Sequence, residues 1–270
     1  MNRPAIGCEI AARLPLLVCG GALALPVLAH RASADETIDI MVEDAAPPWS
    51  NADGTGYAND VVVAAFKEMG VKVKLLVVPY SRCKKMALSG DTPACFSMTW
   101  LPEFKDLIEL SPEPLIKLNA DVFENVEKPV PKSESGGCAL PRGAVAGTVV
   151  EYEYPVETMA LRAAGVEFET ARSDLQSLKK LALRRIDAAI IITNDLEPTD
   201  RKAIESGTEK SVRFAFNCGI ETGSIGFSLK HPRGSWAYET YESGRKRIEQ
   251  NGVLKQIGTL WATRLLGPGE

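Results

Sequence analysis

The segment from Ser97 to Asp106 (SMTWLPEFKD) combines two hydroxyl groups, a tryptophan and several charges directly after a predicted strand. Hydroxyl groups exchange hydrogen bonds with polar ligands, and an indole ring offers a flat stacking surface. The sequence contains no Gly-x-Ser-x-Gly nucleophile motif, no phosphate-binding P-loop and no dinucleotide-binding glycine pattern. His231 lies beside Pro232 and is expected to be a surface histidine. The segment therefore indicates ligand binding, and we expect neither catalysis nor a cofactor.

Similar side chains follow three other predicted strands. In parallel α/β sheets, ligands bind at the carboxyl ends of the strands, so the loops that follow strands are the candidate binding loops. Each of these loops contains an acid, an aromatic residue or a hydroxyl group. The loops are 43–49, 98–104, 151–154 and 193–195.

The elements that position these loops are predicted from hydrophobic periodicity. Alternating or continuous apolar residues predict strands, apolar residues at helical spacing predict helices, and glycines end several of the helices. The pattern strand, helix, strand, helix, strand occurs twice, which is typical of parallel sheets with helices on their faces. The predicted strands are 38–42, 71–78, 94–98, 122–123, 145–151, 166–170, 188–192 and the extended segment 218–229, and the predicted helices are 60–69, 81–88, 154–164, 175–184 and most of 236–266.

The first 34 residues have the pattern of a cleaved secretory signal peptide. Arg3 and Arg13 precede an uncharged stretch from 14 to 30, and Ala32-Ser33-Ala34 has the small-x-small spacing of a cleavage site. A retained membrane anchor is the alternative, but the apolar stretch falls short of the ~18 to 20 residues that a span needs. We therefore expect a soluble exported protein that begins at Asp35.

Charge and length limit the partners. Of the 31 basic and 35 acidic residues, three basic and one acidic residue precede position 35, which leaves 28 basic and 34 acidic residues and a formal net charge of −6. An acidic chain is a poor partner for nucleic acid. The 236 residues from Asp35 onward suit one large or two small α/β units.

Four cysteines follow the predicted signal peptide: Cys83, Cys95, Cys138 and Cys218. An even number in an exported chain indicates two disulfides, for which three pairings are possible. No two of these cysteines have the short spacing of a zinc site, and His231 is the only histidine beyond position 34. We expect no metal site.

The order of several short motifs resembles the type 3 family of periplasmic solute-binding proteins. No single motif is specific, but together they cover nearly all of residues 37–262. They are Pro47-Pro48-Trp49, Gly56-Tyr57 with Asp60, Ser89-Gly90 before a strand, Thr99 with Pro102-Glu103, Ser111 near a proline, Arg185-Ile186-Asp187-Ala188, and Asn251-Gly252 in the closing helical region.

This resemblance implies a type II periplasmic binding protein fold, with two α/β lobes joined by two hinge strands. Lobe 1 would contain residues 37–120 plus 223–270, lobe 2 residues 121–222, and segments 121–123 and 224–227 would be the hinge crossings. The family traps its ligand by closing the lobes around it, a hinge motion. Within this architecture we favour the pairs Cys83–Cys95, which closes a short loop, and Cys138–Cys218, which would lie within one lobe.

Two positions depart from the family members that bind α-amino acids. Those members place an arginine directly after the Pro-Glu pair to hold the ligand carboxylate, where this chain has Phe104. They also usually place an acid, which holds the ligand ammonium, where this chain has Ile192. Burying a zwitterion without either partner would cost several kcal/mol per ion. We therefore expect a ligand that is not a conventional α-amino acid.

Several residues are candidates for ligand contact. Trp49 and Trp100 would stack, Thr99 and Thr193 would hydrogen-bond, and Arg82 or Lys105 would supply positive charge; Tyr152 and Tyr154 begin a predicted helix at the cleft. The alternatives are rim packing for the tryptophans, solvated surface charge for Arg82 and Lys105, and a capping turn for the tyrosines. The candidate ligand-binding set is Trp49, Arg82, Thr99, Trp100, Phe104, Tyr152, Tyr154, Thr193 and Asp195, with Glu43 as a further strand-end acid.

The resemblance and its departures leave two functions open. The first is a monomeric binding protein that captures a small polar or aromatic metabolite for an ABC permease. The second is an accessory or sensor protein that assists a periplasmic enzyme such as a quinoprotein dehydrogenase, since loss of both zwitterion anchors fits such a change of role as well. Dehydratases of cyclic dicarboxylic acids on this fold would need cationic anchors, which Phe104 does not provide.

Overall fold

The structure is a computed structural model that describes residues 36–131 and 137–266. The predicted signal peptide, residues 1–34, lies outside these ranges. Within them, no helix is both long enough and apolar enough to cross a membrane.

The first strand–helix unit forms the parallel half of one sheet. β1 lies between β4 and β5 and runs parallel to both. The predicted strands are found within two residues of their expected ends, whereas the first helix begins at Tyr57, three residues earlier than predicted. The elements are β1 (Glu36–Glu43), α1 (Tyr57–Glu68), β4 (Val71–Val78), α2 (Tyr80–Ser89) and β5 (Ala94–Met98).

The second unit repeats this arrangement. β8 lies between β9 and β10 and is parallel to both, so the carboxyl ends of these strands lie at one edge. The third helix begins at Val156, two residues after the predicted start, because Pro155 has extended backbone geometry at the N-cap. The elements are β8 (Val145–Val149), α3 (Val156–Ala163), β9 (Glu167–Ala171), α4 (Asp174–Ala182), β10 (Ala188–Thr193) and the short, unpredicted α5 (Arg201–Ser206).

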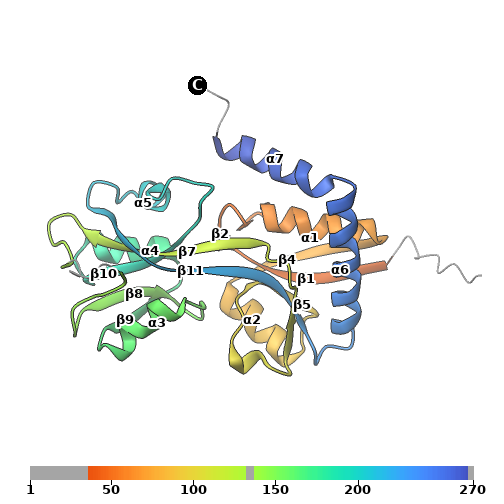
Figure 1. Cartoon of the computed structure of the whole chain (residues 1–270), viewed down its shortest axis with the longest axis horizontal. Helices are drawn as coiled ribbons and strands as arrows, with labels where there is room; N and C mark the ends of the chain where they lie inside the picture. Colours follow the sequence, from red (N-terminus) through yellow and green to blue (C-terminus); the bar gives the residue numbers. More distant parts are fainter. Residues whose placement is uncertain (1–35, 132–136, 267–270) are drawn as a thin grey trace, which may run out of the picture. The chain divides into compact units, whose positions relative to one another are not determined.

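Two long strands join the units. β7 (Ile116–Asn125) and β11 (Val212–Ser228) pair antiparallel along most of their length; β7 also pairs with β10, and β11 with β5 and with β6 (Ile108–Leu110). Figure 1 shows both strands running from one group of elements to the other. The sequence predicted only parts of these strands, namely segment 122–123 of β7 and the extended segment 218–229. β11 begins at Val212, six residues before that predicted extended segment. The result is one continuous path of strands, β4-β1-β5-β11-β7-β10-β8-β9.

The last two helices complete the core of the first unit. α6 (Gly234–Gln250) packs on α1, and α7 (Val253–Leu266) follows it. At Gly244 the two helices approach so closely that an added Cβ would lie 1.9 Å from the carbonyl oxygen of Ala65. Phe66 of α1 and Tyr241 of α6 are fully buried in this contact, with ring centroids 6.0 Å apart. The remaining short elements are β2 (Ala45–Ala46), β3 (Ser50–Asn51) and the 3-10 turn η1 (Pro102–Phe104).

The four cysteines beyond the predicted signal peptide form two pairs at disulfide distance. The Cα atoms of Cys83 and Cys95 lie 5.6 Å apart, and those of Cys138 and Cys218 lie 4.6 Å apart. Both separations fall within the range that a disulfide spans. The structure therefore brings together the two pairs that the sequence favoured.

Candidate ligand-binding site

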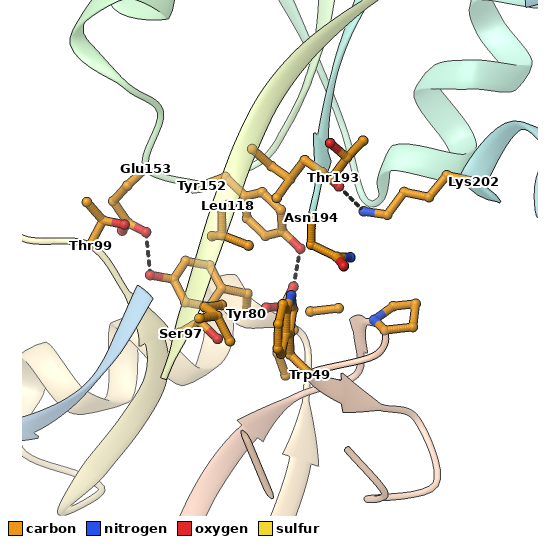
Figure 2. A pocket seen from close by; sticks show the side chains of 15 residues that line it. Trp49, Tyr80, Ser97, Thr99, Leu118, Tyr152, Glu153, Thr193, Asn194 and Lys202 are labelled. Atoms are coloured by element: carbon orange, nitrogen blue, oxygen red, sulfur yellow. Dashed lines mark hydrogen bonds between the residues drawn. The ribbon is translucent and has the colours of Figure 1, made fainter. Parts of the chain in front are cut away.

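A small cavity lies at the junction of the two units. Its volume is about 40 Å³, and its walls come from the ends of β1, β5 and β10, from β7, and from the loop between β8 and α3 (Figure 2). The cavity therefore occupies the place that the strand-end rule predicts. Its lining residues are Glu43, Ala46, Pro47, Trp49, Tyr80, Ser97, Thr99, Ile116, Leu118, Tyr152, Glu153, Ile192, Thr193, Asn194 and Lys202.

Trp49 is fixed in the cavity wall by the start of α1. The backbone N–H of Ala58 donates to the carbonyl oxygen of Trp49 at 3.1 Å, and the Tyr57 ring packs edge-on against the indole at 5.6 Å. Gly56 has φ 153°, and an added Cβ would lie 2.1 Å from the same carbonyl oxygen, so a glycine is required there. Trp49 is 6% exposed and presents a rigid aromatic surface.

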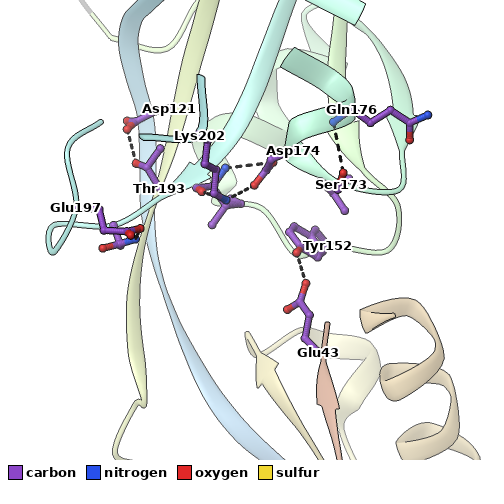
Figure 3. Close-up of polar contacts among 12 residues, drawn as sticks. Glu43, Asp121, Tyr152, Ser173, Asp174, Gln176, Thr193, Glu197 and Lys202 are labelled. Carbon is purple, nitrogen blue, oxygen red and sulfur yellow. Dashed lines mark hydrogen bonds and ion pairs between the residues drawn. The ribbon is translucent and has the colours of Figure 1, made fainter. Parts of the chain in front are cut away.

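Two tyrosines carry hydrogen bonds between the units. Tyr152, from the loop after β8, donates its hydroxyl to Glu43 Oε1 at the end of β1. Tyr80, at the start of α2, donates to Glu153 Oε2 at 2.5 Å, and the two tyrosine rings pack edge-on at 5.4 Å. Figure 2 shows the hydrogen bond between Tyr80 and Glu153, and Figure 3 shows the one between Tyr152 and Glu43.

Glu153 also has a cationic partner. Lys84 Nζ lies 2.9 Å from Glu153 Oε1 and donates to the backbone oxygen of Glu151 at 3.1 Å. The same ammonium lies 5.6 Å from the ring centroid of Phe104, which is fully buried. A lysine from α2 therefore lies over Phe104, but its charge is paired with Glu153.

A second ion pair lies on the other side of the cavity. Lys202, on α5, forms an ion pair with Asp174 and donates to the backbone oxygen of Ile192 at 2.5 Å (Figure 3). Both charged side chains are at least nine-tenths buried. Beside them, Thr193 donates its hydroxyl to Asp121 at 2.5 Å. The lysine is held by partners from its own unit, and its charge is compensated there.

Burial dominates the electrostatics of the two glutamates that accept from tyrosines. Desolvation raises the pKa of Glu43 to about 7, although the hydrogen bond from Tyr152 lowers it. Desolvation also raises the pKa of Glu153, against the opposing effect of Lys84. Burial likewise raises the pKa values of Tyr80 and Tyr152 well above their usual range, so both phenols remain protonated donors.

Four of the predicted ligand-contact residues line the cavity together. These are Trp49, Thr99, Tyr152 and Thr193. The hydroxyl of Thr99 donates to the backbone oxygen of Thr222 at 2.9 Å, which ties the loop after β5 to β11. Their roles in binding remain predictions.

The other five predicted residues do not line this cavity. Trp100 is 58% exposed, whereas Phe104 and Tyr154 are buried among core residues, and the Tyr154 hydroxyl accepts from the Val149 N–H at 2.8 Å. Arg82 lines a separate surface hollow with Lys84 and Lys85. Asp195 is exposed and pairs with Lys117 at 2.8 Å. A ligand role for any of these five would require contacts beyond the cavity.

The sequence analysis missed Tyr80, Glu153 and Lys202 as cavity residues. Tyr80 follows Pro79 at a helix start, and Glu153 lies within a candidate loop, so both carried a weak signal. Lys202 lies on the six-residue α5, whose sequence shows no helical apolar pattern, so nothing pointed to it. Within residues 36–131 and 137–266, no group of three or more histidine, cysteine or acidic side chains could hold a metal ion.

The fold is that of a type II periplasmic binding protein: two α/β lobes joined by two strands. The cavity described above is lined by residues of both lobes. We use lobe 1 for the unit containing β1, β4 and β5, and lobe 2 for the unit containing β8, β9 and β10. The residue boundaries given in the sequence analysis remain a prediction.

Solved structures share this fold over most of the chain. An ancestral arginine-binding protein bound to arginine is 18% identical, with 85% of this chain and 99% of that chain covered and a TM-score of 0.65. A histidine kinase sensor domain with similarity to periplasmic binding proteins is 16% identical, with 83% and 95% covered and a TM-score of 0.65.

An ABC uptake transporter substrate-binding protein from Streptococcus pneumoniae, with bound histidine, is 14% identical, with 83% of this chain and 92% of that chain covered and a TM-score of 0.65. No protein-family model and no curated protein sequence matches the chain. At these identities, the shared property is the fold.

Proposed function

We propose that the chain is an exported solute-binding protein that captures a small polar or aromatic metabolite, not a conventional α-amino acid, between its lobes. The observation that carries this proposal is the cavity itself, which combines an aromatic wall with hydroxyl and carboxyl groups from both lobes. Ligand sites are typically concave and apolar with a few convergent polar groups. A ligand there would contact both lobes at once and favour their closure, because only differential binding can shift that equilibrium.

The charges around the cavity argue against the usual recognition of amino acids. Among the described residues, Lys202 is the only basic side chain that lines the cavity, and Asp174 already compensates its charge. Glu43 and Glu153, by contrast, are both acids. A ligand carboxylate would therefore meet two acids and no free cation, which disfavours binding by the electrostatic and desolvation costs of an unpaired buried charge.

The biological setting follows from the same proposal. A monomeric chain exported by a cleaved signal peptide would collect its ligand in the periplasm and deliver it to an ABC permease. Residues 37–120 with 223–270 would move against residues 121–222, with β7 and β11 as the hinge. The long pairing of these two strands supports this division, because the chain passes between the lobes along them.

A second function is favoured by the direct contacts between the lobes. The chain's own side chains join the lobes. Tyr152 donates a hydrogen bond to Glu43, and Glu153 accepts one from Tyr80 and pairs with Lys84. A chain that brings its lobes together in this way is suited to presenting a fixed surface to a partner. The alternative is therefore a periplasmic accessory or sensor protein that assists an enzyme such as a quinoprotein dehydrogenase.

A ligand panel separates these functions. Under the solute-binding proposal, at least one small metabolite raises the melting temperature, because a ligand that binds only the folded chain stabilises it. Replacement of Trp49 by alanine should weaken that ligand at least tenfold and remove its effect on tryptophan fluorescence. Trp236→Ala is the control, since Trp236 packs under Arg233 at 4.2 Å and does not line the cavity.

The same panel shows which tryptophan matters. Trp100→Ala tests the predicted contact of the exposed Trp100. If no compound shifts the melting temperature, the solute-binding proposal is wrong and the accessory role is favoured. If both Trp49→Ala and Trp100→Ala bind as the wild type does, the ligand lies elsewhere.

A further inference from the structure

Of the two buried acids that line the cavity in the described part of the chain, Glu43 is the one without an ion-pair partner. It is 4% exposed, and its carboxylate accepts a hydrogen bond from Tyr152. None of the ion pairs among the described residues includes it, whereas Glu153 pairs with Lys84. A buried carboxylate without a compensating charge is costly, and it marks a place where a cation from outside would be favourable.

The backbone of Glu43 is held in position by hydrogen bonds. The hydroxyl of Ser50 donates to the carbonyl oxygen of Glu43 at 2.5 Å, and the Asn59 side chain donates to that hydroxyl at 3.2 Å. Glu43 is also the last residue of β1, so the central strand of lobe 1 fixes its direction (Figure 3). The backbone that carries the acid is therefore fixed, and the carboxylate itself is held by the hydrogen bond from Tyr152.

The nearest lysine of the cavity is not available to Glu43. The Lys202 ammonium is bonded to Asp174 and to the backbone oxygen of Ile192. The charge of Lys202 lowers the pKa of Glu43, while the charges of Asp174 and Asp44 raise it. Among the described residues that line the cavity, the titratable partners around Glu43 other than Lys202 are phenols and a further acid, Glu153, while Arg172 lines a separate hollow that also includes Glu43.

Aromatic rings complete a cation-binding environment. Trp49, Tyr80 and Tyr152 come from three different segments and line the same cavity as Glu43. The faces of such rings attract organic cations, as aromatic cages for ammonium groups do. The buried hydroxyl of Ser97 has no hydrogen-bond partner among the described residues and can accept from an ammonium N–H.

The size of the cavity limits what fits. About 40 Å³ accommodates roughly three or four water-sized groups, at about 10–15 Å³ each. A wider hollow of about 570 Å³ shares Trp49 and Ile116 with this cavity; its lining is mostly apolar, with Leu115 and Trp261, and also includes the Lys117–Asp195 ion pair. A small polar head would therefore lie in the cavity, and an apolar body would extend past Trp49.

Resting on the proposed solute-binding function, we infer that the ligand is a primary amine with an aromatic or aliphatic body and no carboxylate. Its ammonium group lies between Glu43 and the rings of Trp49, Tyr80 and Tyr152, and its body lies in the wider hollow. The proposed function alone does not specify this chemical class of ligand. It also accounts for the absence of a carboxylate-binding arginine, since this ligand has no carboxylate to bind.

Calorimetric titration with three probes of matched shape tests the inference. Phenethylamine, 2-phenylethanol and phenylacetate differ chiefly in the charge of the head group. At pH 8 the amine should bind at least tenfold more tightly than the alcohol, and the carboxylate should not bind. If the alcohol or the carboxylate binds as tightly as the amine, the inference is wrong.

Variants link the selectivity to Glu43. Glu43→Gln should weaken amine binding at least tenfold and leave the affinity for the alcohol unchanged. Glu113→Gln, the same change at an exposed acid away from the cavity, should leave both unchanged. Glu43→Asp, which keeps the charge, should retain amine selectivity. The three-probe comparison on the wild-type chain remains decisive even if Glu43→Gln fails to fold.

The pH dependence provides a second readout. Because burial raises the pKa of Glu43 to about 7, amine affinity should fall below pH 7, by up to tenfold per pH unit. Glu43→Gln should lose this dependence. If the metabolite panel yields only ligands without a cationic nitrogen, the amine inference fails while solute binding stands. If the panel and the amine probes yield no ligand at all, the proposed function itself fails.

Discussion

Glu43 of lobe 1 and Asp174 of lobe 2 are both buried acids close to the same cavity, with exposures of 4% and 5%. Asp174 has a lysine beside it, whereas Glu43 has a tyrosine hydroxyl. A cation cancels the charge of a buried carboxylate, but a phenol only hydrogen-bonds to it. Similar burial therefore has opposite consequences: lobe 2 carries a buried ion pair, whereas lobe 1 carries an acid whose charge, once it forms above about pH 7, has no ion-pair partner among the described residues.

The largest expected effect comes from breaking the buried ion pair between Lys202 and Asp174. Lys202→Met leaves Asp174 buried without a cation and should lower the free energy of unfolding by about 3–5 kcal/mol, measured by urea denaturation. The double change Asp174→Asn with Lys202→Met should recover most of this loss, because no unpaired charge remains. A single-variant loss below about 1 kcal/mol would contradict the structural role of this pair.

A smaller effect, with a distinct pH signature, is expected at Glu43. Its pKa is raised from 4.5 to about 7, so the folded chain holds a proton between these pH values that the unfolded chain releases. The wild type therefore loses stability as pH rises through this window, by roughly 3 kcal/mol in total. Glu43→Gln should lack this component and be the more stable chain at pH 8. Parallel stability curves for the two chains between pH 4.5 and 8 would contradict the prediction.

Replacing Tyr152 or Tyr80 by phenylalanine should have a still smaller effect on the free energy of unfolding. Tyr152→Phe removes a hydrogen bond to a charged glutamate that lacks a cation, and at pH 8 it should cost about 2 kcal/mol of unfolding free energy. Tyr80→Phe should cost less, because Lys84 still lies 2.9 Å from Glu153. Chemical denaturation of both variants measures the difference. Equal losses would mean that Lys84 does not compensate Glu153.

The smallest effect is expected where the same lysine replacement is made at the surface. Lys117 and Asp195 lie 2.8 Å apart, but their side chains are 55% and 59% exposed. Water and salt screen such a pair, so many surface pairs contribute nothing measurable. Lys117→Met should leave the urea midpoint unchanged within error, in contrast to Lys202→Met. A clear loss would indicate that this exposed pair is structurally important.

The sequence predicted the repeating elements well, because the strands and long helices carry clear periodicity. β4 and β5 have the predicted ends, whereas α5 was missed because six residues show no apolar repeat. The extent of β11 was underestimated because the exposed residues of its first half, such as Arg213 and Asn217, hide the strand pattern. Local pattern therefore identified the units but not the full length of the strands that join them.

The cavity was predictable in part for a related reason. Trp49, Thr99, Tyr152 and Thr193 follow strands, and the strand-end rule selects such residues. Tyr80 and Lys202 reach the cavity from helices, so only tertiary packing reveals them. The sequence also could not predict that Glu43 has no ion-pair partner among the described residues, because this depends on three-dimensional contacts.

The return of β11 to lobe 1 has a consequence for the order in which the chain folds from its N-terminal side. Ile225, Phe227 and Tyr241 belong to the same core as Ile40 and Phe66, although they lie far apart in the chain. The core strands and helices of lobe 2, by contrast, are contiguous from β8 to β10. Lobe 2 can therefore complete its core first. Lobe 1 must keep the apolar face of α1 uncovered until α6 arrives, which leaves a period in which a chaperone or protease can reach it.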